Sequence, residues 1–136
     1  MNADFRDAHE RHWDDAEMLY NSSRWANADH LYGMAAECGL KCLMLAFGMP
    51  VNPHGVPNPN DRKHANAIWS RYESYRCGHP RGAHYALPAA NPFSNWDVNQ
   101  RYANRSNFDQ ARAQSHQTGA NTVRNLVYTA IRDGLI

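Results

Sequence analysis

The sequence predicts an all-α fold, an up-and-down antiparallel bundle of four to five helices. Apolar residues recur at steps of three and four over long stretches of the chain, which is the period of an amphipathic helix. No stretch shows the alternation of apolar and polar residues that a half-buried strand requires. The chain has 136 residues, the length of one domain, so residues 1–136 are predicted to share a single core.

The first predicted helix begins near Phe5 and ends at the polar run Asn21–Ser23. Side chains of this kind compete for backbone hydrogen bonds and stop a helix. Acidic and basic residues lie mostly off the apolar stripe of this helix and are expected to face water. The stripe consists of Phe5, Ala8, His12, Ala16, Leu19 and Tyr20.

The second predicted helix runs from about Ala26 to Phe47. It is apolar on most sides, which is typical of the central helix of a bundle. Gly33 and Gly39 lie inside it, where each glycine costs about 1 kcal/mol relative to alanine. We therefore expect these glycines to allow close approach of a neighbouring helix. Gly48 and then Pro50 are the signals that end the helix.

A proline-rich connector precedes the third predicted helix. Residues 50–60 hold four prolines and one glycine, so this segment is predicted to be extended. The helix is predicted over about Arg62–Arg76, with Asn60 or Asp61 as its cap. Its buried face consists of Ala65, Ile68, Trp69, Tyr72 and Tyr75.

The last third of the chain is predicted to be irregular first and helical afterwards. Residues 78–95 form a long segment rich in proline, glycine and alanine, and Trp96–Ala103 is predicted to form a short helix. Ser106–Asp109 resembles a capping box with aspartate in place of glutamate. The last helix follows to about Arg132 and ends at Gly134. Its stripe consists of Ala113, Ala120, Val123, Leu126, Val127, Ala130 and Ile131.

Charge and composition exclude several classes of protein. The net charge of +1 argues against a strongly basic nucleic-acid binder, while leaving room for a local basic patch. Residues 1–10 are polar and charged, unlike a signal peptide, and the apolar run 43–47 is far too short to span a membrane. Cys38, Cys42 and Cys77 are expected to be reduced thiols, with the first two buried, which favours a cytoplasmic protein.

Several segments carry a resemblance to a known family. Trp13–Leu19 and Arg24–Leu31 give a helix, a short turn and the start of a second helix, and Ala35–Lys41 then contains Ala36-Glu37 with Leu40-Lys41. This order is similar to the HEPN domain superfamily, with its A-E-x-x-L-K-like signature. Lys63–Ala65 resembles the H-x-L often found at the start of its third helix, and Arg101-Tyr102 resembles the R-Y segment before its last helix.

The resemblance implies a HEPN-like bundle, a fold that commonly dimerises through a bundle face. The family includes RNA-cutting toxins, partners of minimal nucleotidyltransferases and inactive members that only bind proteins. Its catalytic members carry an arginine, four to six residues and then a histidine in or near the last helix. Here three residues separate Arg112 from His116 and ten separate Arg105 from His116, so the family's usual catalytic spacing is missing.

Two arginine–histidine pairs are nevertheless candidate catalytic residues. Arg112 and His116 lie one helical turn apart, so the histidine could move protons while the arginine stabilises a phosphorane. The alternative is a solvated helix face that carries two polar residues. Five residues separate Arg24 from His30, but at the start of the second helix, where Arg24 could simply end a turn and His30 face solvent or the end of the bundle.

The sequence predicts no metal or cofactor site. His9 with His12, and His79 with His84, supply two ligands each, and no complete ligand set accompanies them. No phosphate-binding glycine loop, nucleophile elbow or Rossmann fingerprint is present.

Glu37 and Lys41 are four residues apart in the favoured order within a largely apolar helix. They are predicted to form an ion pair, either purely structural or serving as a polar anchor in a groove between helices.

The segment Gly78–Pro88 is the candidate binding loop. Arginine and tyrosine are common at binding hot spots, so Arg81, His84 and Tyr85 could engage a protein partner or a phosphate. The alternative is a connector that packs across the bundle, with Tyr85, Leu87, Phe93 and Trp96 buried in it.

The sequence favours a non-catalytic HEPN-like protein-binding module. Its expected partner is another protein, such as a toxin in an immunity, antitoxin or defence system, or a second copy of the chain, while RNA is less favoured. The alternatives are a metal-independent HEPN-type ribonuclease and a substrate-positioning partner of a nucleotidyltransferase. The missing catalytic spacing, the small size and the near-neutral charge favour the binding module.

Overall fold

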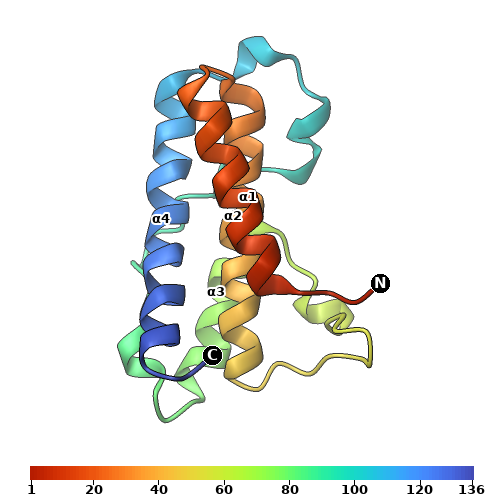
Figure 1. Ribbon diagram of the computed structural model, residues 1–136, viewed down its shortest axis with the longest axis vertical. Coiled ribbons are helices and arrows are strands. Elements are labelled where there is room, and N and C mark those ends of the chain that lie inside the picture. The colour runs from red at the N-terminus through yellow and green to blue at the C-terminus, as the bar shows by residue number, and fades with distance from the viewer.

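The computed structural model describes residues 1–136 and is all-helical, which confirms the predicted all-α class (Figure 1). Four short 3-10 helices, η1 to η4, interrupt the connectors. No strand is present, and the only β-type pairing is an isolated bridge between Val51 and Pro57. The α-helices are α1 (Phe5–Asn21), α2 (Trp25–Ala46), α3 (Ala65–Cys77) and α4 (Gln110–Arg132), and the 3-10 helices are η1 (Pro59–Asp61), η2 (Gly82–Tyr85), η3 (Val98–Tyr102) and η4 (Arg105–Asn107).

The helix directions differ from the predicted up-and-down alternation. A tight turn makes α1 antiparallel to α2, as predicted, but α4 runs parallel to α2. Asp29 of α2 contacts His116 of α4, and further along both helices Gly39 lies against Val123. The helix α3 is also parallel to α2. The two long connectors cause this arrangement, because each returns the chain along the bundle before the next helix begins (Figure 1).

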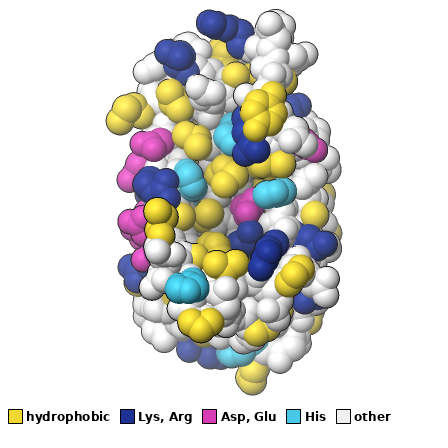
Figure 2. Space-filling model, turned by 90° about the vertical axis from the view of Figure 1, so that its right-hand side faces the viewer, with side chains coloured by type: hydrophobic (Ala, Val, Ile, Leu, Met, Phe, Trp, Pro, Cys, Tyr) yellow, Lys and Arg dark blue, Asp and Glu magenta, His cyan; other side chains and the backbone are white.

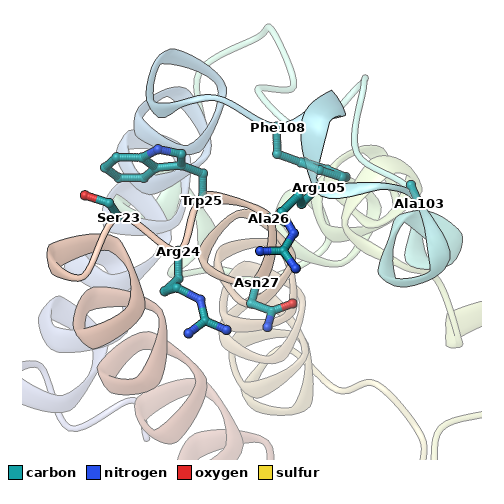
Figure 3. A pocket seen from close by; sticks show the side chains of 8 residues that line it. All are labelled: Ser23, Arg24, Trp25, Ala26, Asn27, Ala103, Arg105 and Phe108. Carbon is teal, nitrogen blue, oxygen red and sulfur yellow. The ribbon is translucent and has the colours of Figure 1, made fainter.

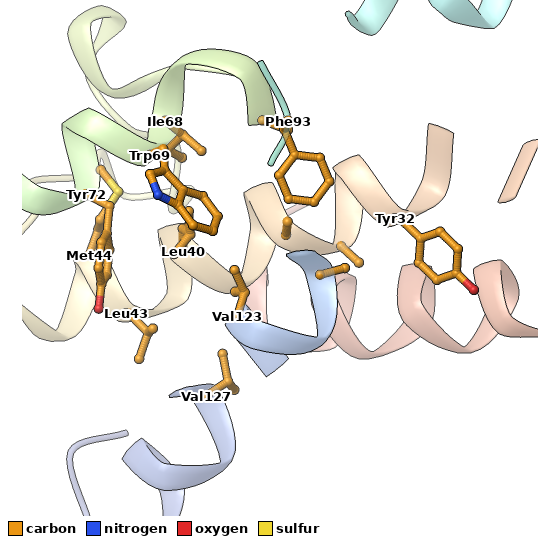
Figure 4. Packing of buried hydrophobic residues seen from close by; sticks show 14 of the residues in the cluster. Tyr32, Leu40, Leu43, Met44, Ile68, Trp69, Tyr72, Phe93, Val123 and Val127 are labelled. Carbon is orange, nitrogen blue, oxygen red and sulfur yellow. The ribbon is translucent and has the colours of Figure 1, made fainter. Parts of the chain in front are cut away.

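The core forms around α2, which packs against all three other α-helices. Figure 4 shows side chains of α2, α3 and α4 meeting in one apolar cluster, with Phe93 from the long connector closing it. Burial of large apolar side chains of this kind is the main source of stability in a domain of this size. The largest fully buried apolar side chains are Tyr32, Leu40, Leu43, Met44, Ile68, Tyr72, Tyr85, Phe93, Trp96 and Val123.

The glycines of α2 allow close packing, as predicted. A Cβ atom on Gly39 would lie 2.7 Å from Nδ1 of His9 and 2.6 Å from a methyl carbon of Val123, so α1 and α4 both approach there. At Gly33 the neighbour is not a helix but the indole ring of Trp96, which a Cβ atom would overlap. Each glycine therefore lies where any side chain would push a neighbour away from α2.

The predicted start of α3 is wrong by one turn. Its first residue is Ala65 and its cap residue is His64, rather than Asn60 or Asp61. Asp61 belongs to η1 and its carboxylate is buried, accepting hydrogen bonds from Arg71 at 2.5 Å and from the Tyr75 hydroxyl at 2.8 Å. Both carboxylate oxygens therefore bind side chains of α3 rather than the backbone N–H groups at its start.

Two further details of the predicted helices need correction. In α1 the most buried side chains are His9, Trp13 and Ala16, so the buried stripe is rotated by about one residue from the predicted one. At the start of α4 the cap is Asp109, whose carboxylate accepts from the backbone N–H of Arg112 at 2.8 Å. Ser106 instead lies inside η4.

All three cysteines are free thiols, with Cys38 and Cys42 buried as predicted. Burial raises the pKa of Cys38 to about 12 and that of Cys42 to about 11, so both are protonated near neutral pH. None of the helices has the length and apolar character needed to cross a membrane.

Candidate functional site

A buried polar network joins α2 to α4 near one end of the bundle. Its centre is Asp29, whose side chain is fully buried. The Asp29 carboxylate accepts a hydrogen bond from Nδ1 of His116 at 2.5 Å and one from Nε2 of Gln100 at 2.6 Å. The Trp96 indole N–H donates to the Asp29 backbone carbonyl at 3.2 Å. These bonds connect η3 and the preceding connector to the same point of α2.

His116 is enclosed within this network. Its side chain is 1% exposed, and its second ring nitrogen is hydrogen-bonded to the Asn95 amide (Nε2–Oδ1 2.8 Å). The ring also stacks on Phe93, with centroids 5.1 Å apart. The expected solvated helix face is therefore wrong for His116, because Asp29 draws the imidazole into the core. With both nitrogens occupied, this histidine has no free nitrogen for a substrate.

Arg112 shares the face of α4 that carries His116, as its spacing predicted. Its Nε atom lies 3.5 Å from Oδ2 of Asp29, the distance of an ion pair, although this buried Nε makes no hydrogen bond. One terminal nitrogen donates to the Asn95 carbonyl at 2.6 Å, and the guanidinium lies over the Phe108 ring at 5.4 Å. The Arg112 side chain is 25% exposed, so Arg112 adds a partly buried ion pair to the network around Asp29.

Glu37 supplies a second carboxylate of α2 and forms the predicted ion pair with Lys41. The Lys41 ammonium donates to Oε1 of Glu37 at 2.6 Å, and both side chains are less than 10% exposed. The sequence did not predict that His64, at the start of α3, donates from Nδ1 to the other oxygen of Glu37 at 3.0 Å. The His64 side chain is 48% exposed, so this side of the pair is open to solvent.

Several histidines gather on one face of the molecule (Figure 2). Figure 2 shows several histidine side chains around a hydrophobic patch, with an acidic side chain near its centre. Burial is the main cause that lowers the pKa of His12 and His30, and Glu37 acts in the opposite direction on both. The two histidines are therefore neutral near physiological pH. His30 stacks on Trp96 with centroids 5.4 Å apart, and its buried Nδ1 makes no hydrogen bond.

The structure does not bring Arg24 and His30 together as a catalytic pair. Arg24 is the exposed cap residue of α2 and lines a cavity at the end of the bundle, whereas His30 packs on Trp96 and lies outside that cavity. No hydrogen bond or ion pair joins Arg24 to His30, and their different surroundings give them no shared substrate position.

The cavity beside Arg24 has a volume of about 350 Å³ and lies between the α1–α2 turn and residues 103–108. Figure 3 shows Arg24 and Asn27 on the α2 side of this cavity, with Arg105 and Phe108 on the opposite side. Neither Arg24 nor Arg105 forms an ion pair with any carboxylate of the chain. The complete lining is Ser23, Arg24, Trp25, Ala26, Asn27, Ala103, Arg105 and Phe108. We refer to it as the arginine cavity.

The predicted binding loop is a packed connector. Tyr85 is 1% exposed and its hydroxyl donates to the carboxylate of Asp133 at 2.6 Å, so its assignment as a displayed binding residue is wrong. Arg81 is exposed, but its guanidinium donates to the Asp133 carbonyl at 2.8 Å. His84 remains exposed. The aromatic content of this segment explains the result, because Tyr85 and Phe93 complete the core.

No group of three or more histidine, cysteine, aspartate or glutamate side chains has an arrangement suited to holding a metal ion. The pair His9 and His12 does not converge on one site. His9 is buried, with Nδ1 donating to the Ala35 carbonyl at 2.7 Å, whereas His12 is half-buried.

Asp29, Gln100 and Asn95 are the members of the network that sequence reasoning missed. The position of Asp29 did carry a signal in the sequence. It lies at helical spacing from three residues on the buried side of α2, which are Tyr32, Ala36 and Leu40. A carboxylate on this buried side needs a partner inside the fold. Gln100 and Asn95 gave no comparable signal, since their positions depend on the path of the connector.

Comparison with protein-family models, curated proteins and solved structures finds no match to this chain.

Proposed function

We propose that this chain is a non-catalytic, HEPN-like protein-binding module that acts by masking a partner protein in a bacterial toxin–immunity, antitoxin or defence system. The observation that carries the proposal is the enclosure of His116. In the HEPN-type reaction the histidine must exchange a proton with substrate, and here both of its nitrogens are occupied by Asp29 and Asn95 in the core.

The surface of the bundle offers groups suited to protein recognition. Tyr102 is 77% exposed and stacks with the Arg101 guanidinium at 4.8 Å, next to the arginine cavity. Exposed arginine and aromatic side chains are the groups most often found at the energetic centres of protein interfaces. Met18 is a further large apolar side chain left exposed on α1.

Affinity purification of the tagged full chain from its native cells tests the proposal. We expect one protein at near-stoichiometric amount, identified by mass spectrometry. The purified partner should rebind the purified chain and lose its own activity in the complex. Recovery of no partner, or only of a dimer of this chain, would contradict the masking function.

One observation favours a second candidate, a metal-independent ribonuclease of HEPN type. Arg112 and His116 do converge, since both reach the carboxylate of Asp29. RNA cleavage in the presence of a chelator, lost in His116→Ala and retained in His30→Ala, would support this activity. Circular dichroism of both variants would show that loss of cleavage does not reflect unfolding. If RNA stays intact with the native chain, the ribonuclease is eliminated.

A further inference from the structure

We infer that the arginine cavity is the contact site of the module and accepts an acidic segment of the partner protein. The inference rests on the proposed protein-binding function and adds to it a location and a partner chemistry. It starts from the cavity of about 350 Å³ and its two guanidinium groups. This volume is within the range of pockets that bind ligands in proteins.

The two arginines of the cavity have no carboxylate partner, unlike five of the ten other arginines of the chain. Arg71 is paired with Asp61, and Arg76 with Glu73. The Arg24 and Arg105 side chains make no hydrogen bond or ion pair, although they line the same cavity from opposite sides (Figure 3). Guanidinium groups recognise carboxylates through paired N–H donors, so two of them around one cavity select an anionic group.

The aromatic walls of the cavity are held in place by the fold. Trp25 lies edge-on to Tyr20 with ring centroids 5.1 Å apart, and Phe108 is 8% exposed beneath the Arg112 guanidinium. Walls that are already rigid lower the entropic cost of binding a ligand. An anion in this cavity would therefore be flanked by apolar surface, which suits a peptide with acidic and apolar side chains.

Charge around the cavity favours an acidic protein segment over a nucleic acid. Binding of a nucleic acid requires several cations along the phosphate backbone, and the chain has a net charge of only +1. One exposed carboxylate, Asp109, directly follows Phe108 of the cavity lining. Its charge opposes a continuous phosphate backbone, whereas a short acidic segment need only reach the two arginines.

The test is a fluorescence-anisotropy titration of the full chain with a labelled peptide of alternating glutamate and leucine. The matched variants are Arg24→Glu with Arg105→Glu, and Arg81→Glu with Arg132→Glu at the opposite end of the bundle. Both pairs change the net charge equally. We expect the first pair to weaken binding at least about tenfold and the second to change it less than about threefold. A lysine–leucine peptide should not bind.

Three outcomes would overturn the inference. The first is no binding of the glutamate–leucine peptide by the native chain. The second is equal loss of binding in both variant pairs, which would indicate a diffuse charge effect. The third is tight binding of single-stranded RNA that only Arg24→Glu with Arg105→Glu removes. If the purified native partner still binds this variant pair, the location fails while the protein-binding function stands. If no partner exists, the function itself fails.

Discussion

The central helix α2 carries two carboxylate–histidine pairs that look alike in chemistry and differ in surroundings. Asp29 is paired with His116 at 2.5 Å, and Glu37 with His64 at 3.0 Å. The histidine of the first pair is 1% exposed, whereas that of the second is 48% exposed. A carboxylate paired with an imidazole is therefore enclosed in the core in one place and accessible to solvent in the other.

The difference follows from what packs over each histidine. Phe93 stacks on the His116 ring and Asn95 occupies its remaining nitrogen, so the long connector closes the first pair. His64 precedes the first turn of α3 at the edge of the bundle, where no aromatic ring stacks on it. Burial raises the cost of an unpaired charge, so the first pair should matter far more for stability than the second.

Removal of the buried carboxylate is expected to have the largest effect. Asp29→Ala should lower the free energy of unfolding by about 3–5 kcal/mol, because it leaves His116 and Gln100 without their acceptor inside the core. Urea denaturation followed by circular dichroism measures this change. Asp14→Ala, which removes an exposed carboxylate of α1, serves as the control and should cost less than about 0.5 kcal/mol.

Removal of the Lys41 ammonium, which binds the Glu37 carboxylate of the second pair, should have an intermediate effect on stability. Lys41→Met keeps the packing of the aliphatic stem but leaves Glu37 with His64 alone, so we expect a loss of about 1–3 kcal/mol in the same denaturation experiment. Lys63→Met, at an exposed position without an ion pair, is the matched control. A loss no larger than that of the control would show that Glu37 does not depend on Lys41.

The pH dependence of stability should reflect the histidines that lie near the two pairs. Burial lowers the pKa values of His9, His12 and His30 below 6.5 in the folded chain. At pH values between the lowered pKa of each folded histidine and 6.5, the unfolded chain binds more protons than the folded chain. The contribution of these histidines to the free energy of unfolding is therefore fully present above about pH 6.5 and is lost on acidification. The slope is at most about 1.4 kcal/mol per pH unit for each proton.

Urea denaturation at a series of pH values tests this dependence. His9→Gln should reduce the dependence of the free energy of unfolding on pH. Protonation of the buried His9 ring adds a charge and places a hydrogen on Nε2, which has no hydrogen-bond partner. A free energy of unfolding that stays constant from about pH 7 to about pH 5 would contradict the assigned pKa shifts.

Removal of the exposed histidine is expected to have the smallest effect. His64→Ala should lower the free energy of unfolding by less than about 1 kcal/mol, because a half-exposed contact with a carboxylate gains little over solvation. The side chain of His64 also makes no capping hydrogen bond to α3, so no cap is lost. A cost equal to that of Asp29→Ala would erase the distinction between the two pairs.

The helices themselves were predictable from the sequence. The second helix was expected over Ala26–Phe47 and occupies Trp25–Ala46, and the stop at Gly134 is confirmed by its positive φ of 68°. These features depend on neighbours within a few residues, because helical periodicity and terminal signals are local properties of the chain. The ion pair of Glu37 and Lys41 was predictable for the same reason.

The sequence alone determined an all-helical chain, the approximate positions of its four α-helices and the central place of α2. Tertiary structure decided the parallel course of α3 and α4, the enclosure of His116, the burial of Tyr85 and the meeting of Arg24 with Arg105 around one cavity. The reason is physical: a helix forms from contacts one turn apart, whereas these arrangements depend on how connectors return across the bundle. Burial then determines which of two similar polar pairs is structural.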